Sequence, residues 1–382
     1  MPHIIPAKHR SWLAAIPTLL FVFPGIMLHS PASADVVVTA GSEKILLKPI
    51  AQGLNEPWSM AFLPDGRMLV TEKSGKLRMI ENGKLLPQPI ANAPKVVSRG
   101  QGGLLDVVLH PNYAENGWLY LSYSGKGEGG VGTEIMRAKL KGKQLVENEV
   151  IFRQAPKIGT SKHFGSRIVF DREGYLYITM GDRGEQDRAQ QLGQHVGKVI
   201  RLNDDGSVPQ DNPFSGKADA LPEIYSYGHR NMQGAAINPR SGKIWTHEHG
   251  PQGGDEINIL NAGTNYGWPA ITYGVNYFTG TKIGEGTQKA GMAQPLYKWV
   301  PSIAPSGMAF YTGDAYPSWK GSLFVGSLKF HTLVKLTLDG DKVVKEERLL
   351  EGVGRLRDVR QGPDGLLYLI AGDRLLQLQP VR

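Results

Sequence analysis

The sequence of 382 residues contains no cysteine. Without thiols the chain cannot form disulfides, a thiolate nucleophile or a zinc–thiolate site. A run of basic residues is also missing, because Lys and Arg are scattered along the chain although the formal net charge is +8. A scattered basic surface argues against a nucleic-acid partner and leaves an anionic small ligand as an alternative.

Long apolar segments are equally rare, and the one such segment lies at the N-terminus. Basic residues 8–10 precede an apolar run over 12–28, and the small residues 32–34 are typical of a cleavage site. This order predicts a cleaved secretory signal peptide over 1–34; a membrane anchor is the alternative, which the short and proline-broken run disfavours. We therefore expect a periplasmic or secreted protein without stable membrane insertion. Loss of two positive side chains would leave 35–382 with a net charge of +6.

Helical periodicity is scarce as well, since Gly and Pro punctuate the whole chain. A two-strand unit recurs instead: an apolar strand, a turn with Pro, Asp, Asn or Gly, and a second apolar strand. The six copies lie at 61–70, 107–121, 168–180, 236–245, 308–325 and 359–369.

The copies are spaced roughly 45–75 residues apart, a range that suits propeller blades with loop insertions. The sequence therefore predicts an all-β fold, a six-bladed β-propeller of four-stranded antiparallel sheets, with 35–382 as a single domain. A sandwich or barrel would not usually need this length or spacing. The strand at 36–39 is expected to complete the last blade and close the ring.

Polar, Gly-rich segments between the repeats carry the candidate catalytic groups. His163 stands in a Gly- and Ser-bounded loop before a strand, where a neutral imidazole suits a general base. Asp182 follows the same blade's second strand and could orient that imidazole. Gln101, among glycines, offers both a donor and an acceptor to a ligand. Each of these residues, taken alone, could instead be a turn residue.

Several cations lie in comparable segments. Arg230 offers a planar fork of donors for a carboxylate or a quinone oxygen, with the Asn231 amide beside it. Lys329, Arg355 and Arg357 come later, and the two arginines would share one face of a strand. Clustered cations near a channel predict a small ligand bearing several carboxylates.

The segment 247–258 contains His-Glu-His-Gly but lacks the His-Glu-x-x-His spacing of a helical zinc site. Its carboxylates and Gly- and Pro-rich backbone instead favour Ca²⁺, which accepts carboxylate and carbonyl oxygens.

Five motifs in this order make the chain resemble the soluble pyrroloquinoline-quinone (PQQ)-dependent sugar dehydrogenases of the glucose/sorbosone dehydrogenase family, and the aldose sugar dehydrogenases in particular. The resemblance covers the chain from about residue 54 to the last blade. The motifs are Gln101–Asp106, His163–Arg167, Tyr227–Gly234, Glu248–Asn258 and Arg355–Asp358.

The resemblance implies the oxidation of an aldose sugar at C1 to the lactone, with hydride transfer to the quinone. It implies His163 as the base, with Gln101 and Asp182 beside it, and Arg230 as the group that stabilises negative charge on the quinone. The cofactor-binding residues it implies are Gln101, His163, Arg230, Asn231, Lys329, Arg355 and Arg357. It further implies that the carbonyls of Gly250 and Pro251 bind the Ca²⁺ at the quinone, and that Glu256 and Tyr266 belong to a structural calcium site.

Two other functions remain open from the sequence: a calcium-dependent propeller lactonase or hydrolase, and a non-catalytic carbohydrate-binding propeller. The hydrolase would have no need of Lys329, Arg355 and Arg357 together. The carbohydrate-binding propeller leaves a channel that carries a candidate base unexplained. Tyr297 and Trp299 are candidates for packing against the quinone or sugar. The preferred sugar and the electron acceptor, a cytochrome or a quinone, are not specified, and either a monomer or a homodimer is compatible with the sequence.

Overall fold

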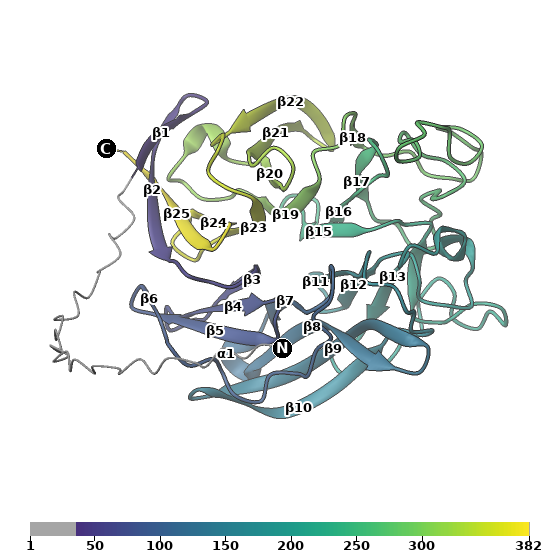
Figure 1. Cartoon of the computed structure of the whole chain (residues 1–382), viewed down its shortest axis with the longest axis horizontal. Helices are drawn as coiled ribbons and strands as arrows, with labels where there is room; N and C mark the ends of the chain where they lie inside the picture. Colours follow the sequence, from purple (N-terminus) through teal and green to yellow (C-terminus); the bar gives the residue numbers. More distant parts are fainter. Residues whose placement is uncertain (1–35, 382) are drawn as a thin grey trace, which may run out of the picture. The chain divides into compact units, whose positions relative to one another are not determined.

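The strands form six antiparallel sheets around one central axis (Figure 1); the computed structural model describes residues 36–381. Five sheets have four strands and one has five. The inner strand of each sheet contacts the inner strands of its two neighbours, so the sheets close into a ring. The prediction of a six-bladed β-propeller is confirmed, with one blade a strand larger than expected.

The blades are numbered here in chain order, and their strands are given from the channel outward. Blade 1 has β3 (Pro57–Phe62), β4 (Met68–Glu72), β5 (Lys76–Glu81) and β6 (Lys84–Leu85). Blade 2 has β7 (Leu104–Leu109), β8 (Trp118–Gly127), β9 (Gly130–Lys141) and β10 (Gln144–Arg153). Blade 3 has β11 (Gly165–Phe170), β12 (Leu176–Met180), β13 (Lys198–Leu202) and β14 (Ile224–Tyr227). Blade 4 has β15 (Met232–Ile237), β16 (Ile244–Glu248), β17 (Asp255–Ile259) and β18 (Tyr297–Trp299). Blade 5 has β19 (Pro305–Phe310), β20 (Leu323–Ser327), β21 (Leu333–Asp339) and β22 (Lys342–Leu349). Blade 6 has β23 (Leu356–Gln361), β24 (Leu367–Ala371), β25 (Arg374–Pro380), β2 (Glu43–Ala51) and β1 (Val36–Ala40). The helical segments in the described part are α1 (Tyr113–Asn116) and the 3₁₀ turns η1 (Gln186–Gln190) and η2 (Pro317–Trp319).

The turn of the recurring unit has a local cause in the sequence. In blade 1 the Asp65 carboxylate accepts a hydrogen bond at 3.1 Å from the N–H two residues on, and Gly66 follows with φ +87°. Blade 6 repeats this with Asp364, again at 3.1 Å, and Gly365 with φ +77°. A short acceptor followed by a residue that tolerates left-handed φ makes a tight turn.

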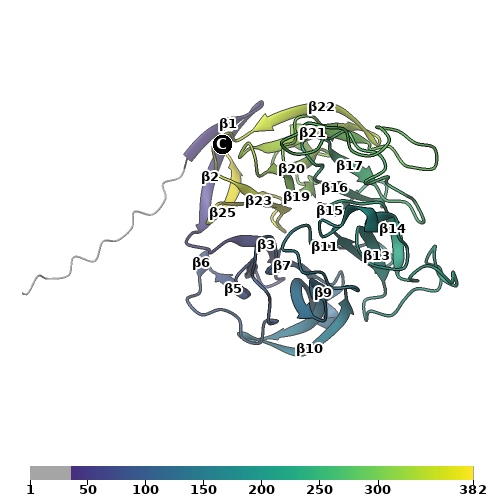
Figure 2. The same cartoon turned by 45° about the vertical axis from the view of Figure 1, so that its right-hand side comes forward.

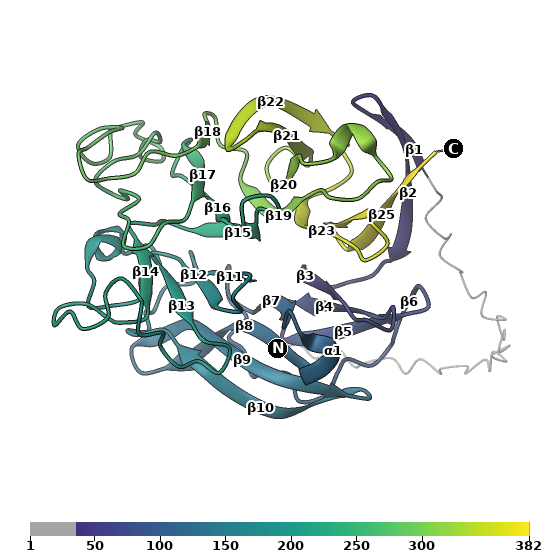
Figure 3. The same ribbon diagram turned by 180° about the vertical axis from the view of Figure 1, so that it is seen from behind.

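The ring closes where the two ends of the chain meet. Strand β2 pairs antiparallel with β25, with Ile45 opposite Pro380, and β1 pairs with β2 on the outside. Strand β2 lies beside β25, and β1 lies outside β2 at the edge of the ring (Figure 2, Figure 3). The strand predicted over 36–39 therefore joins the expected blade, but β2 is the strand that closes it, and β1 adds a fifth, half-exposed strand.

Each inner strand begins with an irregularity in its pairing. The register shifts at Pro57/Ser59, Leu104/Val107, Gly165/Ile168, Met232/Gly234, Pro305/Met308 and Leu356/Asp358. Such bulges redirect side chains and often lie beside active sites. Residues at the starts of the inner strands of blades 1, 4 and 6, and just before that of blade 2, line one cavity, so these starts share one end of the channel.

A buried ionic cluster joins the inner strands midway along the channel. Arg167 lies 3.3 Å from Asp106 and 3.0 Å from Asp358, and Arg360 lies 2.8 and 3.1 Å from the same two carboxylates. The Ser59 hydroxyl donates to Asp106 at 2.6 Å. Two arginines and two aspartates from the inner strands of blades 2, 3 and 6 thus balance one another, and blade 1 adds the Ser59 hydroxyl. The channel is filled at this level by paired charges.

Apolar side chains from neighbouring blades form the remaining core, for example between blades 1 and 2 and between blades 5 and 6. No helix in residues 36–381 is both long and apolar enough to cross a bilayer. The signal peptide predicted over 1–34 lies outside the described residues and stays a prediction.

Candidate active site

A histidine–carboxylate pair stands at the bulged end of the channel, in the loops of blade 3. His163 Nδ1 lies 2.6 Å from Asp182 Oδ1. His163 comes just before β11 and Asp182 just after β12, and these two strands pair, so the hairpin brings both side chains to one end. Because an ionised carboxylate only accepts, Nδ1 carries the proton and Nε2 keeps its lone pair.

The pKa shifts agree with this proton arrangement. Burial lowers the pKa of His163 below its ordinary value, against the hydrogen bond with Asp182; Arg230 lowers it further. Burial alone would raise the pKa of Asp182, but the bond to His163 and the Gly184 N–H lower it below its usual range. A neutral imidazole therefore faces an ionised carboxylate near neutral pH.

Three further contacts hold this pair. The Gln101 side chain accepts a hydrogen bond from His163 N at 2.7 Å, and His163 has φ +54°. A left-handed conformation is uncommon for a residue with a side chain and persists where its surroundings fix it. On the other side, Trp268 Nε1 donates to Asp182 Oδ2 at 2.8 Å, and Gln190 donates to the Trp268 carbonyl at 2.7 Å.

A cavity with ≈ 510 Å³ of empty space, open to solvent, lies next to the loop that carries His163, although His163 itself is not among its lining residues. Its walls include Gln101 and Asn231, whose side-chain oxygens accept hydrogen bonds from the backbone of the His163 loop. Arg355 and Arg357 form another wall. The remaining lining residues are Trp58, Lys73, Gly100, Gln233, His249 and Leu328.

The two arginines of this wall lack an acidic partner. Among the described residues neither Arg355 nor Arg357 has a carboxylate oxygen within 4.0 Å, and Arg357 donates to Gln233 at 3.3 Å. Burial, together with the charges of Arg355 and Arg167, lowers the pKa of Arg357 to about 9. An anion in the cavity would offset this repulsion. Arg355 and Arg357 therefore line the same cavity, as their predicted shared face requires, although the pairing of β23 shifts register between Leu356 and Asp358.

Lys329, the third cation predicted from the sequence, is placed differently. Its side chain is exposed, and its ammonium lies 5.1 Å from the Phe330 ring centre. The neighbouring Leu328 lines the cavity. The cation that the structure brings to the cavity beside the arginines is Lys73.

Arg230 and Asn231 are held by a second buried carboxylate. Glu248 Oε2 accepts hydrogen bonds from the backbone N–H of Arg230 at 2.5 Å and of Asn231 at 3.3 Å. Its Oε1 lies 3.0 Å from His229 Nδ1. The Arg230 guanidinium donates to the His249 carbonyl at 3.1 Å, and its Nε is buried without a partner. It therefore keeps donor capacity for a ligand.

A smaller cavity lies next to Arg230 and His249. Glu248, Gly250, Glu256 and Tyr266 line it, with Trp268. Burial and the nearby Glu248 carboxylate raise the pKa of Glu256 to about 8. The sequence assigned Gly250 and Glu256 to two calcium sites, whereas the structure places both residues around one cavity.

The other two residues assigned to calcium have partners of their own. The Pro251 carbonyl accepts a hydrogen bond from the Tyr277 hydroxyl at 3.0 Å. The Tyr266 hydroxyl donates to the Ile259 carbonyl at 2.6 Å, so its backbone carbonyl is the oxygen left for a cation. No cluster of three or more His, Asp or Glu side chains suited to a metal occurs within residues 36–381. A cation here would need backbone oxygens as well.

The sequence prediction was wrong about the aromatic residues. Tyr297 and Trp299 lie on β18, the outermost strand of blade 4, and both donate to Glu346 at 2.8 Å. The aromatic residue in the large cavity is Trp58. Trp58, Lys73, Gln233 and Trp268 were missed as site residues. Trp58 and Gln233 lie at the bulged starts of inner strands, a regularity that alignment of the six repeats could have revealed.

Comparison with known proteins identifies the family of this chain. The chain matches the Glucose / Sorbosone dehydrogenase family over residues 54–378. It is 44% identical to the Aldose sugar dehydrogenase YliI of Escherichia coli, over 97% of this chain and 99% of that protein. It is 28% identical to the Quinoprotein glucose dehydrogenase B of Acinetobacter calcoaceticus, over 89% of each chain.

Solved structures show the same propeller. The apo-form of the soluble Aldose sugar dehydrogenase from Escherichia coli superposes with a TM-score of 0.86 at 44% identity, covering 88% of this chain and all of that one. The PQQ-bound Aldose Sugar Dehydrogenase from Streptomyces coelicolor superposes with a TM-score of 0.72 at 29% identity, covering 92% of this chain and 99% of that one. The chain, with its six blades and its histidine–carboxylate pair at the channel mouth, belongs to the Glucose / Sorbosone dehydrogenase family of oxidoreductases.

Proposed function

We propose that this protein is a PQQ- and calcium-dependent aldose dehydrogenase that oxidises the sugar at C1 to the lactone. One observation carries the proposal: an imidazole with a free Nε2, oriented by Asp182, stands beside a cavity walled by arginines that lack acidic partners. Two relatives, named as an aldose sugar dehydrogenase and a quinoprotein glucose dehydrogenase, support it.

The large cavity fits a tricarboxylate quinone. Its lining combines cationic, amide and aromatic side chains, as a site for an anionic aromatic ligand requires. Arg355 and Arg357 offer unpaired guanidinium groups, and Trp58 offers an aromatic surface. When bound, PQQ would supply the two-electron oxidant that takes the hydride from the sugar.

His163 would move the proton in this reaction. Its Nε2 lone pair takes the proton from the anomeric hydroxyl while the hydride leaves C1. Asp182 holds the Nδ1–H and stabilises the imidazolium that forms, as the carboxylate of a triad does. Gln101 fixes the backbone that presents the ring.

Arg230 would stabilise the negative charge that develops during hydride transfer. Its carbonyl accepts a hydrogen bond from Asp182 N at 2.7 Å, so it stands next to the base. Its buried Nε has no partner, and a preorganised cationic donor is most effective where water is excluded. Glu248 fixes its backbone.

The small cavity fits a calcium ion. Two carboxylates, Glu248 and Glu256, face it together with a Gly-rich backbone, and the raised pKa of Glu256 shows that negative charge is destabilised there. A cation would reverse that effect, and Ca²⁺ accepts carboxylates and carbonyls. We assign Glu256 to this ion, with backbone oxygens of Gly250, Pro251 and Tyr266 as its other candidates.

The signal peptide that the sequence predicts over 1–34 would direct the protein to the periplasm or out of the cell. The electrons would then leave to a cytochrome or a quinone. N-terminal sequencing of the protein recovered from cells tests the location. A mature chain that begins near residue 35 is expected, and an intact N-terminus would contradict export.

Reconstitution tests the function. Purified 35–382, stripped of cofactors, is mixed with PQQ and Ca²⁺, and dye reduction is followed over a panel of aldoses. Turnover that requires both additions is expected, and the panel identifies the sugar. Quinone binding without turnover on any sugar would contradict an aldose substrate. Failure to bind quinone would leave the hydrolase or the carbohydrate-binding propeller.

A further inference from the structure

Lys73 occupies the cationic wall although no sequence motif marks it. It follows β4 directly, and its backbone is fixed on both sides: its N–H donates to the Glu56 carbonyl at 3.1 Å and its carbonyl accepts from Leu104 N at 3.2 Å. Only 17% of its side chain is exposed. The residue is therefore held between blades 1 and 2, beside the large cavity.

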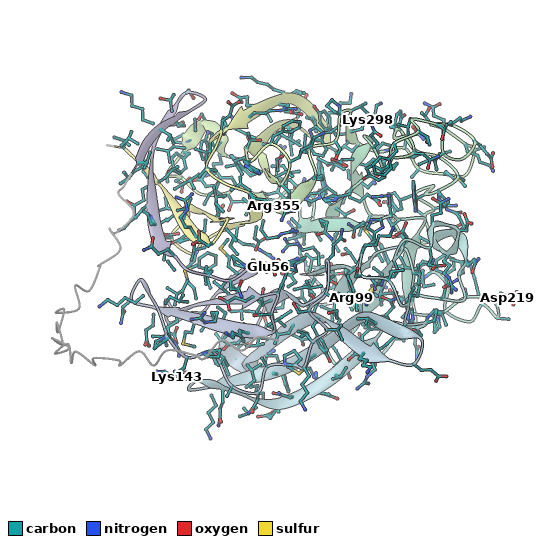
Figure 4. All side chains as sticks on the ribbon, viewed as in Figure 1. Glu56, Arg99, Lys143, Asp219, Lys298 and Arg355 are labelled. Carbon is teal, nitrogen blue, oxygen red and sulfur yellow. The ribbon has the colours of Figure 1, made fainter. Side chains whose placement is uncertain are left out.

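The same cations also border a second hollow. Lys73, Arg355 and Arg357 line an adjoining cavity of ≈ 640 Å³ that opens between blades 1 and 6. Glu56 and Asp373 are its acidic members. Figure 4 shows Glu56 and Arg355 near the centre of the ring, at the inner ends of these two blades. The same three cations therefore line both cavities, and the acidic residues Glu56 and Asp373 line only the second.

Lys73 has a partner that a ligand can replace. Its ammonium lies 2.8 Å from a Glu56 oxygen, and 63% of the Glu56 side chain is exposed. An ion pair with so exposed a partner contributes little, roughly 0–1 kcal/mol. A ligand carboxylate in the less hydrated cavity would attract the ammonium more strongly than Glu56 does.

We propose that Lys73 binds a carboxylate of the quinone cofactor, as the third cation of the wall formed with Arg355 and Arg357, and that Glu56 competes for it. The inference rests on the proposed function, because it assumes that the cavity takes the tricarboxylate. It adds Lys73 to the cations predicted from the sequence and leaves the prediction for Lys329 as it stands.

Cofactor binding, without turnover, provides the test. The dissociation constant of PQQ is measured by titration of the cofactor-free full-length mature protein at fixed salt. Lys73→Met is expected to raise it about tenfold, the usual loss for one charge-assisted contact. Glu56→Gln is expected to lower it about threefold, because the competing carboxylate is gone.

Two lysine variants serve as matched controls. Lys243→Met removes an exposed cation that pairs with Asp341 at 2.9 Å. Lys243 lies in the turn between β15 and β16 of blade 4 and lines neither cavity. This variant is expected to bind PQQ within about twofold of the unchanged protein. Lys73→Arg keeps the charge and is expected to restore most of the affinity.

The outcomes separate the two claims. Unchanged affinity in both Lys73→Met and Glu56→Gln, with binding intact in the unchanged protein, overturns the role of Lys73 and leaves the cofactor assignment standing. Equal losses in Lys73→Met and Lys243→Met have the same meaning. Absence of PQQ binding in the unchanged protein overturns both the inference and the proposed function. Thermal unfolding of each variant shows that the fold is retained.

Discussion

Two histidine–carboxylate pairs in this protein have nearly the same local geometry and opposite surroundings. His163 Nδ1 lies 2.6 Å from Asp182, and His229 Nδ1 lies 3.0 Å from Glu248. In the second pair Ser226 Oγ lies 2.9 Å from His229 Nε2, which completes the atoms of a catalytic triad.

The pairs differ in what the second ring nitrogen does. His163 Nε2 has no hydrogen-bond partner among residues 36–381, and 12% of its side chain is exposed beside the cavity. His229 is wholly buried, stacks on Tyr266 at 4.6 Å, and has both nitrogens occupied. A carboxylate beside a histidine is thus not enough for catalysis. The remaining nitrogen must also face a space that a substrate can enter.

The same substitution at both histidines tests this difference most directly. His163→Ala is expected to lower kcat by about 10²–10⁴-fold, the usual contribution of a general base, while PQQ binding and thermal stability stay near their original values. Steady-state kinetics, a PQQ titration and a melting curve measure these three quantities. Turnover close to normal would remove His163 from its role.

His229→Ala is expected to act on stability. It leaves a Glu248 oxygen buried without its partner and removes a ring packed against Tyr266, which costs about 3 kcal/mol of unfolding free energy. Denaturant unfolding measures this loss. Because Glu248 still holds the backbone of Arg230, the protein that remains folded should keep most of its kcat. A large fall in kcat at unchanged stability would show that the buried pair takes part in the reaction.

The pH dependence gives a smaller effect on the open pair. Activity should rise with pH through the pKa of His163, which lies below its ordinary value of 6.5, because only the neutral ring accepts a proton. Trp268→Phe removes the donor on Asp182, which makes the carboxylate a stronger acceptor and raises the pKa of His163. The acid limb of kcat/KM should move to higher pH by up to about one unit. A limb that stays in place would show that Trp268 serves packing alone.

The fold was largely predictable because its information is local. A turn such as that at Asp65 and Gly66 is determined by neighbouring residues, and turns rich in Pro, Asp, Asn or Gly follow apolar strands along the chain, so the six copies could be counted. The sequence prediction made residues 36–39 the closing strand, whereas the strand that closes the ring is the next one, β2. Residues 36–39 and β2 both read as strands, and only the pairing with β25, far along the chain, decides between them.

The site residues also fall into those that local patterns reveal and those that only contacts between blades bring together. His163 and Asp182 flank one hairpin, and Arg355 and Arg357 lie two residues apart at the start of β23, so short patterns found them. Trp268 reaches Asp182 from an insertion of blade 4. Lys73 reaches the cavity from the end of β4, where the sequence has no motif. Contacts between blades depend on how the ring closes, which a local pattern does not contain.

That closure also bears on how the chain is ordered. Ile45 pairs with Pro380, so the last blade cannot exist until nearly the whole chain is present, and its formation closes the longest loop the molecule contains. A closed ring has a cyclic order of blades but no first blade. The ends of the described chain mark only where the cycle is cut. Because β1 and β25 lie in one sheet, a linker between these two ends and a new cut in an exposed turn of another blade would preserve every strand pairing.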